Sequence, residues 1–253
     1  MSPAPATRPL DIGRALDLAL LIYTRNFVAL AVAMAVAVVP LGLLTIAPPP
    51  WGVMGAFLQT VVLAGVTPGI ATLIVSDVRA GAEPTVASVW RRLAPMLAGL
   101  VLTVGLAYLI AIVSIVLFFV PLLLLVVWFQ LVGEVVVVER LRFLAAMRRS
   151  RNLVQGSYWR VAGYLILSVL ITGVASGALA AAPTAAALQF GIHVDAAAAI
   201  GDALTIAARV LVAPVGALLM ALLYFDLRMR HDGSDIAAML DALPAAPFAG
   251  APR

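Results

Sequence analysis

The sequence predicts an all-α polytopic membrane protein with six transmembrane helices, interfacial amphipathic helices and a candidate internal repeat of three hairpins. Hydrophobic residues make up 64% of the 253 positions. Charged residues make up 11%, against about 25% in a typical soluble domain. The basic residues are all arginines, and they gather in a few connections between long apolar runs. Too few polar residues remain to cover a soluble domain, so we expect one membrane domain over residues 9–232.

The first element expected is an interfacial helix over about residues 10–25, after a Pro- and Ala-rich stretch at residues 1–8 that we expect to be disordered. Apolar side chains recur there at helical spacing and oppose Arg14 and Asp17. The several charges in this stretch argue against a membrane span and favour a helix lying in the interface. No signal-peptide pattern precedes the first long apolar run, so we expect that run to remain as an anchor.

Six apolar stretches come close to the roughly 20 residues that cross a bilayer core of about 30 Å. They cover residues 27–47, 52–76, 93–120, 121–138, 161–182 and 196–225. We expect Pro68 and Pro214 to kink the second and sixth spans. Pro121 marks a tight return between the third and fourth spans.

The arginines predict the orientation of these spans. All but one lie in the N-terminal segment, in the second-to-third and fourth-to-fifth connections, and in the tail. The other connections contain none, so the positive-inside rule puts both termini in the cytoplasm. We therefore expect a multi-pass protein of the cytoplasmic (inner) membrane, with residues 233–253 as a cytoplasmic tail.

The fourth-to-fifth connection is the most basic stretch of the chain. We predict an interfacial helix over about residues 139–155, with Phe143 and Met147 on its apolar side and Arg142 and Arg149 opposite. One interpretation is a lipid-facing connector that sets topology. The other is a docking site for anionic lipid or an acidic partner. The candidate contact residues are Arg142, Arg148, Arg149 and Arg151.

Short motifs in and after this connection suggest a family. They comprise Glu139, Ala146, Arg149, Ser150, Leu153, Gly156, Trp159 and Arg160, and near the end Tyr224, Asp226 and Arg228. In this arrangement the chain resembles the membrane domain family associated with glycerophosphoryl diester phosphodiesterases, over roughly residues 10–240. The resemblance implies a stand-alone membrane domain without a catalytic domain. Since that membrane domain has no established chemistry, the resemblance mainly implies architecture.

The candidate repeat consists of an interfacial stretch followed by a two-helix hairpin. Its three returning helices all end in an acidic residue with an arginine beside it. A helix dipole disfavours an acid at the C-terminus, so we expect a neighbouring arginine to hold each acid. We predict a cytoplasmic ring of ion pairs formed by Asp77, Arg79, Glu139, Asp226 and Arg228. The alternative is a set of independent interfacial pairs, each contributing little to stability.

Three ionisable residues, Glu134, Asp202 and Arg209, lie inside predicted spans, where such groups are functional candidates. Glu134 precedes Glu139 by five residues, which puts it roughly 7–8 Å inside the inner interface. A structural role and contact with a substrate or proton both remain open for Glu134, and Gln130 adds a polar group one turn earlier. We expect Arg209 to extend toward the outer surface, or to bind an anionic ligand there.

Several function classes lack the residues they need. Cysteine is absent, and no HExxH, GxSxG, phosphate-binding glycine loop or carboxylate cluster occurs. We therefore predict no enzyme, no catalytic, cofactor-binding or metal-binding residues, and no nucleic-acid partner.

The leading hypothesis is a scaffold or lipid-associated factor whose partners are membrane lipids, anionic ones included; a protein partner stays unknown. The alternative is a small transporter or permease that uses Glu134, Asp202 and Arg209. A wet cavity lined by Glu134 would favour transport, whereas a filled apolar core would favour the scaffold.

Overall fold

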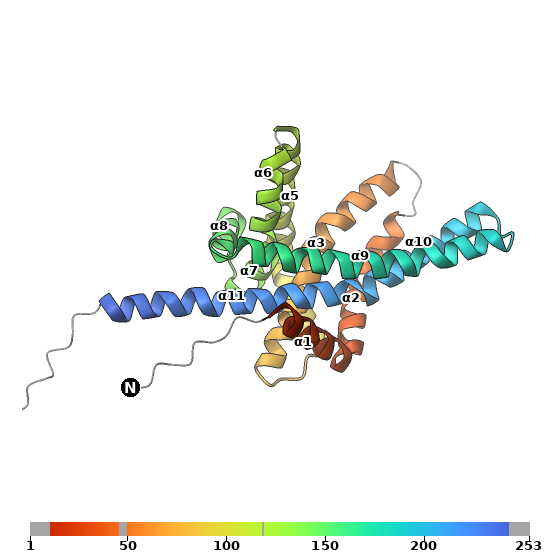
Figure 1. The fold of residues 1–253 in the computed structure, drawn as a ribbon. Coiled ribbons are helices and arrows are strands. Elements are labelled where there is room, and N and C mark those ends of the chain that lie inside the picture. The colour runs from red at the N-terminus through yellow and green to blue at the C-terminus, as the bar shows by residue number, and fades with distance from the viewer. Residues whose placement is uncertain (1–10, 46–49, 118, 243–253) are drawn as a thin grey trace, which may run out of the picture.

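The computed structural model describes residues 11–45, 50–117 and 119–242, and at 115–117, 119–123 and 234–242 the backbone alone. Every regular element in these ranges is helical, which confirms the all-α prediction (Figure 1). The predicted disordered stretch at residues 1–8 lies outside the described residues. The elements in chain order are α1 (Ile12–Arg25), α2 (Phe27–Thr45), α3 (Trp51–Arg79), α4 (Val86–Leu93), the 3-10 turn η1 (Ala94–Met96), α5 (Leu97–Leu117), α6 (Phe119–Phe129), α7 (Val132–Glu139), α8 (Phe143–Val154), α9 (Tyr158–Gln189), α10 (Val194–Leu211) and α11 (Ala213–Ala242).

Five helical stretches within the described residues are long and apolar enough to cross a membrane. They are Phe27–Thr45, Trp51–Arg79, Val86–Ser114, Tyr158–Gln189 and Val194–Gly233. The chain is therefore built like a membrane protein, as predicted. The sequence predicted six such spans, and the fourth of them, at residues 121–138, is not among these five.

The span predicted at residues 121–138 is not one continuous helix. It is divided between α6 and α7 by a turn at Gln130 and Leu131, and neither helix alone is long enough to cross. The turn brings Gly133 close to α3: a Cβ on Gly133 would lie 3.0 Å from the Pro68 Cγ. Close packing of α7 against α3 is the physical reason that the apolar pattern did not become one straight helix.

The interfacial helix predicted over about residues 139–155 also begins later than expected. The helix α7 ends at Glu139, and α8 starts at Phe143. Between them Arg140 has a φ of 56°, and Phe143 itself has a φ of 51°. Left-handed backbone is uncommon for such residues, and here it reverses the chain direction between two helices. The amide of Phe143 donates to the Thr103 Oγ1 at 3.0 Å, which ties this reversal to α5.

The predicted sixth span, residues 196–225, is divided in a similar way. The helix α10 ends at Leu211, and α11 begins at Ala213 with Pro214 in its first turn, where proline is tolerated. The helix α11 then continues to Ala242, through the boundary predicted between residues 232 and 233.

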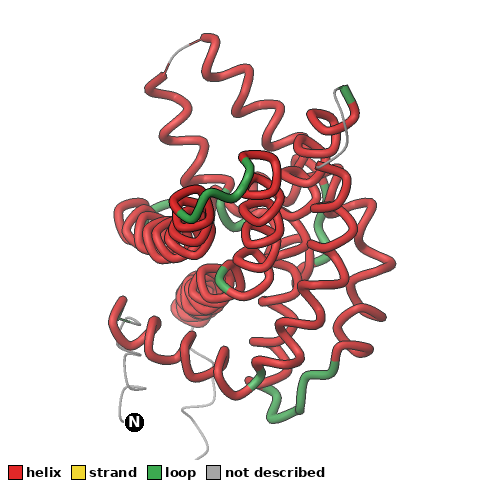
Figure 2. Tube along the Cα trace, turned by 90° about the vertical axis from the view of Figure 1, so that its right-hand side faces the viewer, coloured by secondary structure: helices red, strands yellow, loops and turns green. Residues whose placement is uncertain are grey.

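Three helical hairpins diverge from a shared base (Figures 1 and 2). They are formed by α2 with α3, α5 with α6, and α9 with α10. The helix α11 packs against α1, α3 and α9, and it runs beside α9 in Figure 1. Fully buried side chains such as Leu100, Tyr164 and Tyr224 lie in the shared core, whereas the outer parts of the hairpins expose residues such as Phe57 and Val174. Exposed apolar side chains on long helices are what lipid contact requires.

Candidate functional site

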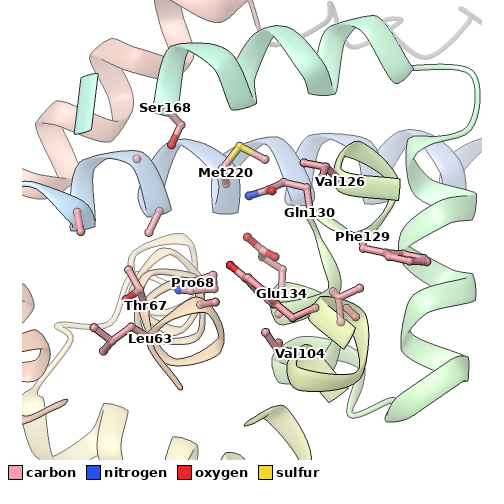
Figure 3. Close-up of a pocket in the computed structure, with 18 of the residues that line it drawn as sticks. Leu63, Thr67, Pro68, Val104, Val126, Phe129, Gln130, Glu134, Ser168 and Met220 are labelled. Atoms are coloured by element: carbon pink, nitrogen blue, oxygen red, sulfur yellow. The ribbon is translucent and has the colours of Figure 1, made fainter. Parts of the chain in front are cut away.

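A cavity of about 440 Å³ is lined by residues of α3, α5, α6 and α9, which belong to the three hairpins, together with residues of α7 and α11. Most of its wall is apolar. Figure 3 shows the side chains of Glu134 and Gln130 directed into this space, with Thr67 and Ser168 on other walls. The polar side chains on its wall are Thr67, Tyr108, Gln130, Glu134, Ser168 and Thr172. A mostly apolar cavity with a few polar groups is the usual form of a small-molecule site.

Glu134 is the most unusual residue of this wall. It is 1% exposed, and neither of its carboxylate oxygens has a hydrogen-bond partner in the part of the chain that the structure describes. An ionised carboxylate without a partner in a buried position is destabilising by several kcal/mol, roughly. Glu134 must therefore be neutral when the cavity is empty, or meet a partner that enters the cavity.

The turn at residues 130–131 places Glu134 in this position. Because α7 begins at Val132, Glu134 lies in its first turn, where the helix dipole favours a negative charge. Had the helix continued unbroken from α6, Glu134 would lie in a helix interior without that stabilisation. The sequence pointed to Glu134 as a candidate, but not to the helix start beside it.

Pro68 interrupts the backbone hydrogen bonding of α3 where this helix lines the cavity. Pro68 lies inside α3 and has no backbone N–H, so the carbonyl of Ala64 loses its helical hydrogen bond. Both residues line the cavity. The helix break before α7, the proline in α3 and the start of α11 at Ala213 therefore all meet at one cavity.

Gly216 allows α9 and α11 to approach each other closely on the cavity wall. A Cβ on Gly216 would lie 2.9 Å from the Thr172 Cγ2, so a larger residue could not occupy this position without a shift. The hydroxyl of Thr172 donates to the carbonyl of Ser168 at 2.7 Å. This contact fixes the Thr172 side chain on the cavity wall.

A second cavity of about 260 Å³ lies beside the first and contains Arg209. The guanidinium donates to the Oε1 of Gln59, a residue that is only 3% exposed. Asp202, by contrast, is exposed and lines neither cavity. Of the three residues predicted inside spans, the structure thus places Glu134 and Arg209 at adjoining cavities and leaves Asp202 apart. Gln59 was not among the predicted site residues, although a glutamine inside an apolar run can be recognised in the sequence.

A cluster of charged side chains, the Arg149 cluster, joins the C-terminal end of α7 to α8 and α11. Arg149 Nε donates to both carboxylate oxygens of Glu139, at 2.8 and 3.1 Å, and its Nη2 donates to Asp232 Oδ1 at 2.8 Å. The hydroxyl of Tyr224 donates to Glu139 Oε1 at 3.0 Å, and Arg228 pairs with Asp232 at 3.4 Å.

The ion pairs of this cluster determine the pKa of Arg149. Burial acts to lower the pKa of Arg149, but the carboxylates of Asp232 and Glu139 outweigh burial and raise it above the ordinary value. Arg149 therefore stays charged at every accessible pH. This corrects one expectation: Arg149 does not point away from the packed side of its helix but lies half-buried over Glu139 and Asp232.

The other acids of the predicted ring are also paired. Asp226 accepts from Arg160 at 2.8 Å and from Arg230 at 3.0 Å. Asp77 pairs with Arg92 of α4.

Arg79, the arginine predicted beside Asp77, lies instead over the Phe225 ring, 4.5 Å from its centroid. Each of the three acids is thus held by an arginine other than the one beside it in the predicted motif. Asp226 was predicted at a helix end, but it lies inside α11. A closed ring stays a prediction.

The remaining arginines of the basic connection differ from Arg149. Arg142 and Arg148 are exposed. Arg151 is exposed as well, and its guanidinium lies 4.5 Å from the centroid of the Trp128 ring. These three side chains keep donors available at the surface of the molecule, so they are the ones that an anionic surface would meet.

No metal site accompanies these features. Across the described ranges, no three His, Cys, Asp or Glu side chains gather in a way that could hold a metal ion.

Comparison with known proteins gives one finding. The model of a family described as "Domain of unknown function (DUF7847)" matches residues 56–227, which is more than half of the chain. This range contains every residue that lines the larger cavity. No curated protein and no solved structure matches the chain.

Proposed function

The chain belongs to the family described as a domain of unknown function (DUF7847), and we propose that it is a small transporter or permease that holds its solute at Glu134. The observation behind this proposal is the buried carboxylate without a partner on the wall of a cavity. A solute with a positive charge or a strong hydrogen-bond donor would supply that partner. A purely structural glutamate would have been expected to receive one from the chain itself.

The interrupted helices around the cavity support the same proposal. Transporters bind solutes where membrane helices are broken, because a break frees backbone polar groups and directs helix ends at the solute. Here Pro68 and the turn at residues 130–131 interrupt helices that line the same cavity as Glu134. A protein that only needed a rigid scaffold would gain nothing from these interruptions.

We further infer six crossings in total, with α6 and α7 together forming the fourth in chain order. Residues 119–139 would extend roughly 30 Å at 1.5 Å per residue, which matches a bilayer core. The distribution of arginines then favours cytoplasmic termini in the cytoplasmic membrane. The three hairpins are consistent with an internal repeat, and with the architecture implied by the resemblance to phosphodiesterase-associated membrane domains.

A lipid-associated scaffold is the second candidate function. It is favoured by the exposed arginines of the basic connection, Arg142, Arg148 and Arg151. Each arginine near an anionic membrane surface adds about 1 kcal/mol of attraction. Such attraction is compatible with transport, so the cavity and not the arginines distinguishes the two functions.

The test is solute uptake into proteoliposomes that contain the full-length chain. The probes are tetramethylammonium, choline and neutral amino acids. We expect uptake of at least one probe above that of empty liposomes, and a decrease of at least about ten-fold in Glu134→Gln, the equivalent of about 1.4 kcal/mol.

Asp202→Asn is the matched control, because it removes a carboxylate that lines neither cavity. It should transport as well as the unmodified chain. Uptake that is equal in Glu134→Gln and the unmodified chain would contradict the transport proposal. Absence of uptake for all probes, together with retained anionic lipid, would favour the scaffold.

A further inference from the structure

The two cavities are lined by opposite charges that have no charged partner among the described residues. Glu134 lies on the wall of the larger cavity and Arg209 on the wall of the smaller one. The cavities adjoin, since Leu63, Thr67 and Ala213 line both. A solute that occupies both would therefore meet a carboxylate at one end and a guanidinium at the other.

Arg209 is only partly satisfied by the protein. It pairs with the neutral side chain of Gln59 through one nitrogen, although a guanidinium has five N–H donors. No acidic side chain pairs with Arg209 among the described residues. A half-buried guanidinium facing a cavity with unused donors is suited to a carboxylate or a phosphate, which accept two parallel hydrogen bonds.

No ion pair joins Glu134 and Arg209 among the described residues. Both cavities are lined by α3, where Gln59 marks the Arg209 end and Pro68 the Glu134 end. These positions are nine residues apart, which is roughly 13 Å along a helix. The protein thus keeps two opposite charges separated by a mostly apolar passage.

We propose that the solute of this site is a zwitterion, with an ammonium group at Glu134 and a carboxylate or phosphate at Arg209. This inference rests on the proposed function, because it names the class of solute for the same cavity. The zwitterion is either a free solute, such as an amino acid with a chain between its charged groups, or the ethanolamine headgroup of a phospholipid. Both carry an ammonium and an anionic group, but the headgroup has only two carbons between its charges, so the separation of the charges distinguishes the two sources.

The experiment measures equilibrium binding to the purified full-length chain in detergent micelles. The free-solute probes are γ-aminobutyrate and ε-aminocaproate, which differ in the separation of their charges. Caproate and hexylamine are the single-charge controls, since each keeps the chain and one end group of ε-aminocaproate. The lipid probe is phosphatidylethanolamine, offered in nanodiscs against phosphatidylglycerol.

The variants are Glu134→Gln and Arg209→Gln, with Asp202→Asn as the matched control. We expect one zwitterionic probe to bind at least ten-fold more tightly than its single-charge controls. Glu134→Gln should remove the advantage over caproate, and Arg209→Gln should remove the advantage over hexylamine. Asp202→Asn should leave both advantages unchanged. Preference for phosphatidylethanolamine that both variants abolish would identify the headgroup as the zwitterion.

Two results would overturn the inference. Binding that depends on Glu134 but not on Arg209 would mean that the solute has only a cationic end, and the proposed function would stand. Binding that depends on neither side chain would contradict both the zwitterion and the Glu134 site. Thermal unfolding of each variant in the same detergent separates loss of binding from loss of fold.

Discussion

Two glutamates of α7, five residues apart, have opposite surroundings. Glu139 accepts hydrogen bonds from Arg149 and Tyr224, and its side chain is 13% exposed. Glu134 is 1% exposed and has no hydrogen-bond partner in the described part of the chain. The same residue type in the same helix is thus fully paired at one end and unpaired at the other.

The difference distinguishes a carboxylate that stabilises the fold from one that does not. Glu139 joins three helices, because its partners come from α8 and α11. Glu134 has no hydrogen-bond partner within the described ranges, and it destabilises the folded chain whenever it is ionised without a ligand. A group that lowers stability and still occupies a cavity is a candidate for function, whereas a fully paired group is better explained by structure.

The largest expected effect on stability comes from removing the paired glutamate. Glu139→Ala leaves Arg149 and the Tyr224 hydroxyl without their shared acceptor. We expect a loss of about 2–3 kcal/mol in the free energy of unfolding, below that of a fully buried pair because Arg149 keeps some contact with solvent. Titration with dodecyl sulfate in mixed micelles measures this free energy. Glu83→Ala, an exposed glutamate in a loop, should change it little; equal losses in the two variants would show that Glu139 has no special role.

A smaller effect is expected at the contact that positions Glu134. Gly133→Ala would place a Cβ 3.0 Å from the Pro68 Cγ, so α7 or α3 must shift. Overpacking of this kind is destabilising by about 1–3 kcal/mol. We expect a loss near the lower end of that range, together with weaker solute binding, in the same unfolding and binding measurements. Gly173→Ala is the control, since a Cβ there would meet no atom within 4 Å. Unchanged binding in Gly133→Ala would mean that the α7–α3 contact does not shape the cavity.

Neutralising Glu134 should not lower the free energy of unfolding, in contrast to the two changes above. Glu134→Gln removes a buried acid without removing any hydrogen bond made by the folded chain. We expect the unfolding free energy to be unchanged or to rise by up to about 1 kcal/mol, while solute binding is lost. If Glu134→Gln destabilises the chain as much as Glu139→Ala does, Glu134 has a structural partner and the contrast between the two glutamates fails.

The smallest effect is expected on lipid binding. Arg148 and Arg149 form a contrast similar to that of the two glutamates, since one is unpaired among the described residues and the other is paired. Arg148 is exposed, whereas Arg149 is held by two carboxylates. Arg148→Gln should weaken binding to anionic vesicles by about 1 kcal/mol at low salt and leave unfolding unchanged. Arg149→Gln should mainly lower stability. Vesicle flotation at two salt concentrations measures the lipid effect, and equal weakening by both variants would argue against the structural role of Arg149.

The sequence predicted the helical class and the long apolar stretches because these depend on local composition. It also indicated Glu134 as a candidate, because a single acid inside an apolar run is visible in the sequence. It did not predict the turn at residues 130–131. That turn depends on close packing of Gly133 against Pro68, two positions far apart in the chain. Nor did it predict which arginines pair with Asp77, Glu139 and Asp226. Glu139 pairs with Arg149 and not with the adjacent Arg140, since the chain reversal after α7 brings α8 back over Glu139.

The most direct test of the contrast is modification of the full-length chain with dicyclohexylcarbodiimide. This apolar reagent reacts with protonated carboxyl groups in apolar surroundings, and peptide mass spectrometry identifies the modified residue. We expect Glu134 to be modified and Glu139 to stay unmodified, because an arginine and a tyrosine hold the Glu139 carboxylate. The modification should disappear in Glu134→Gln. Modification of Glu139 at an equal rate, or an unmodified Glu134, would contradict the account.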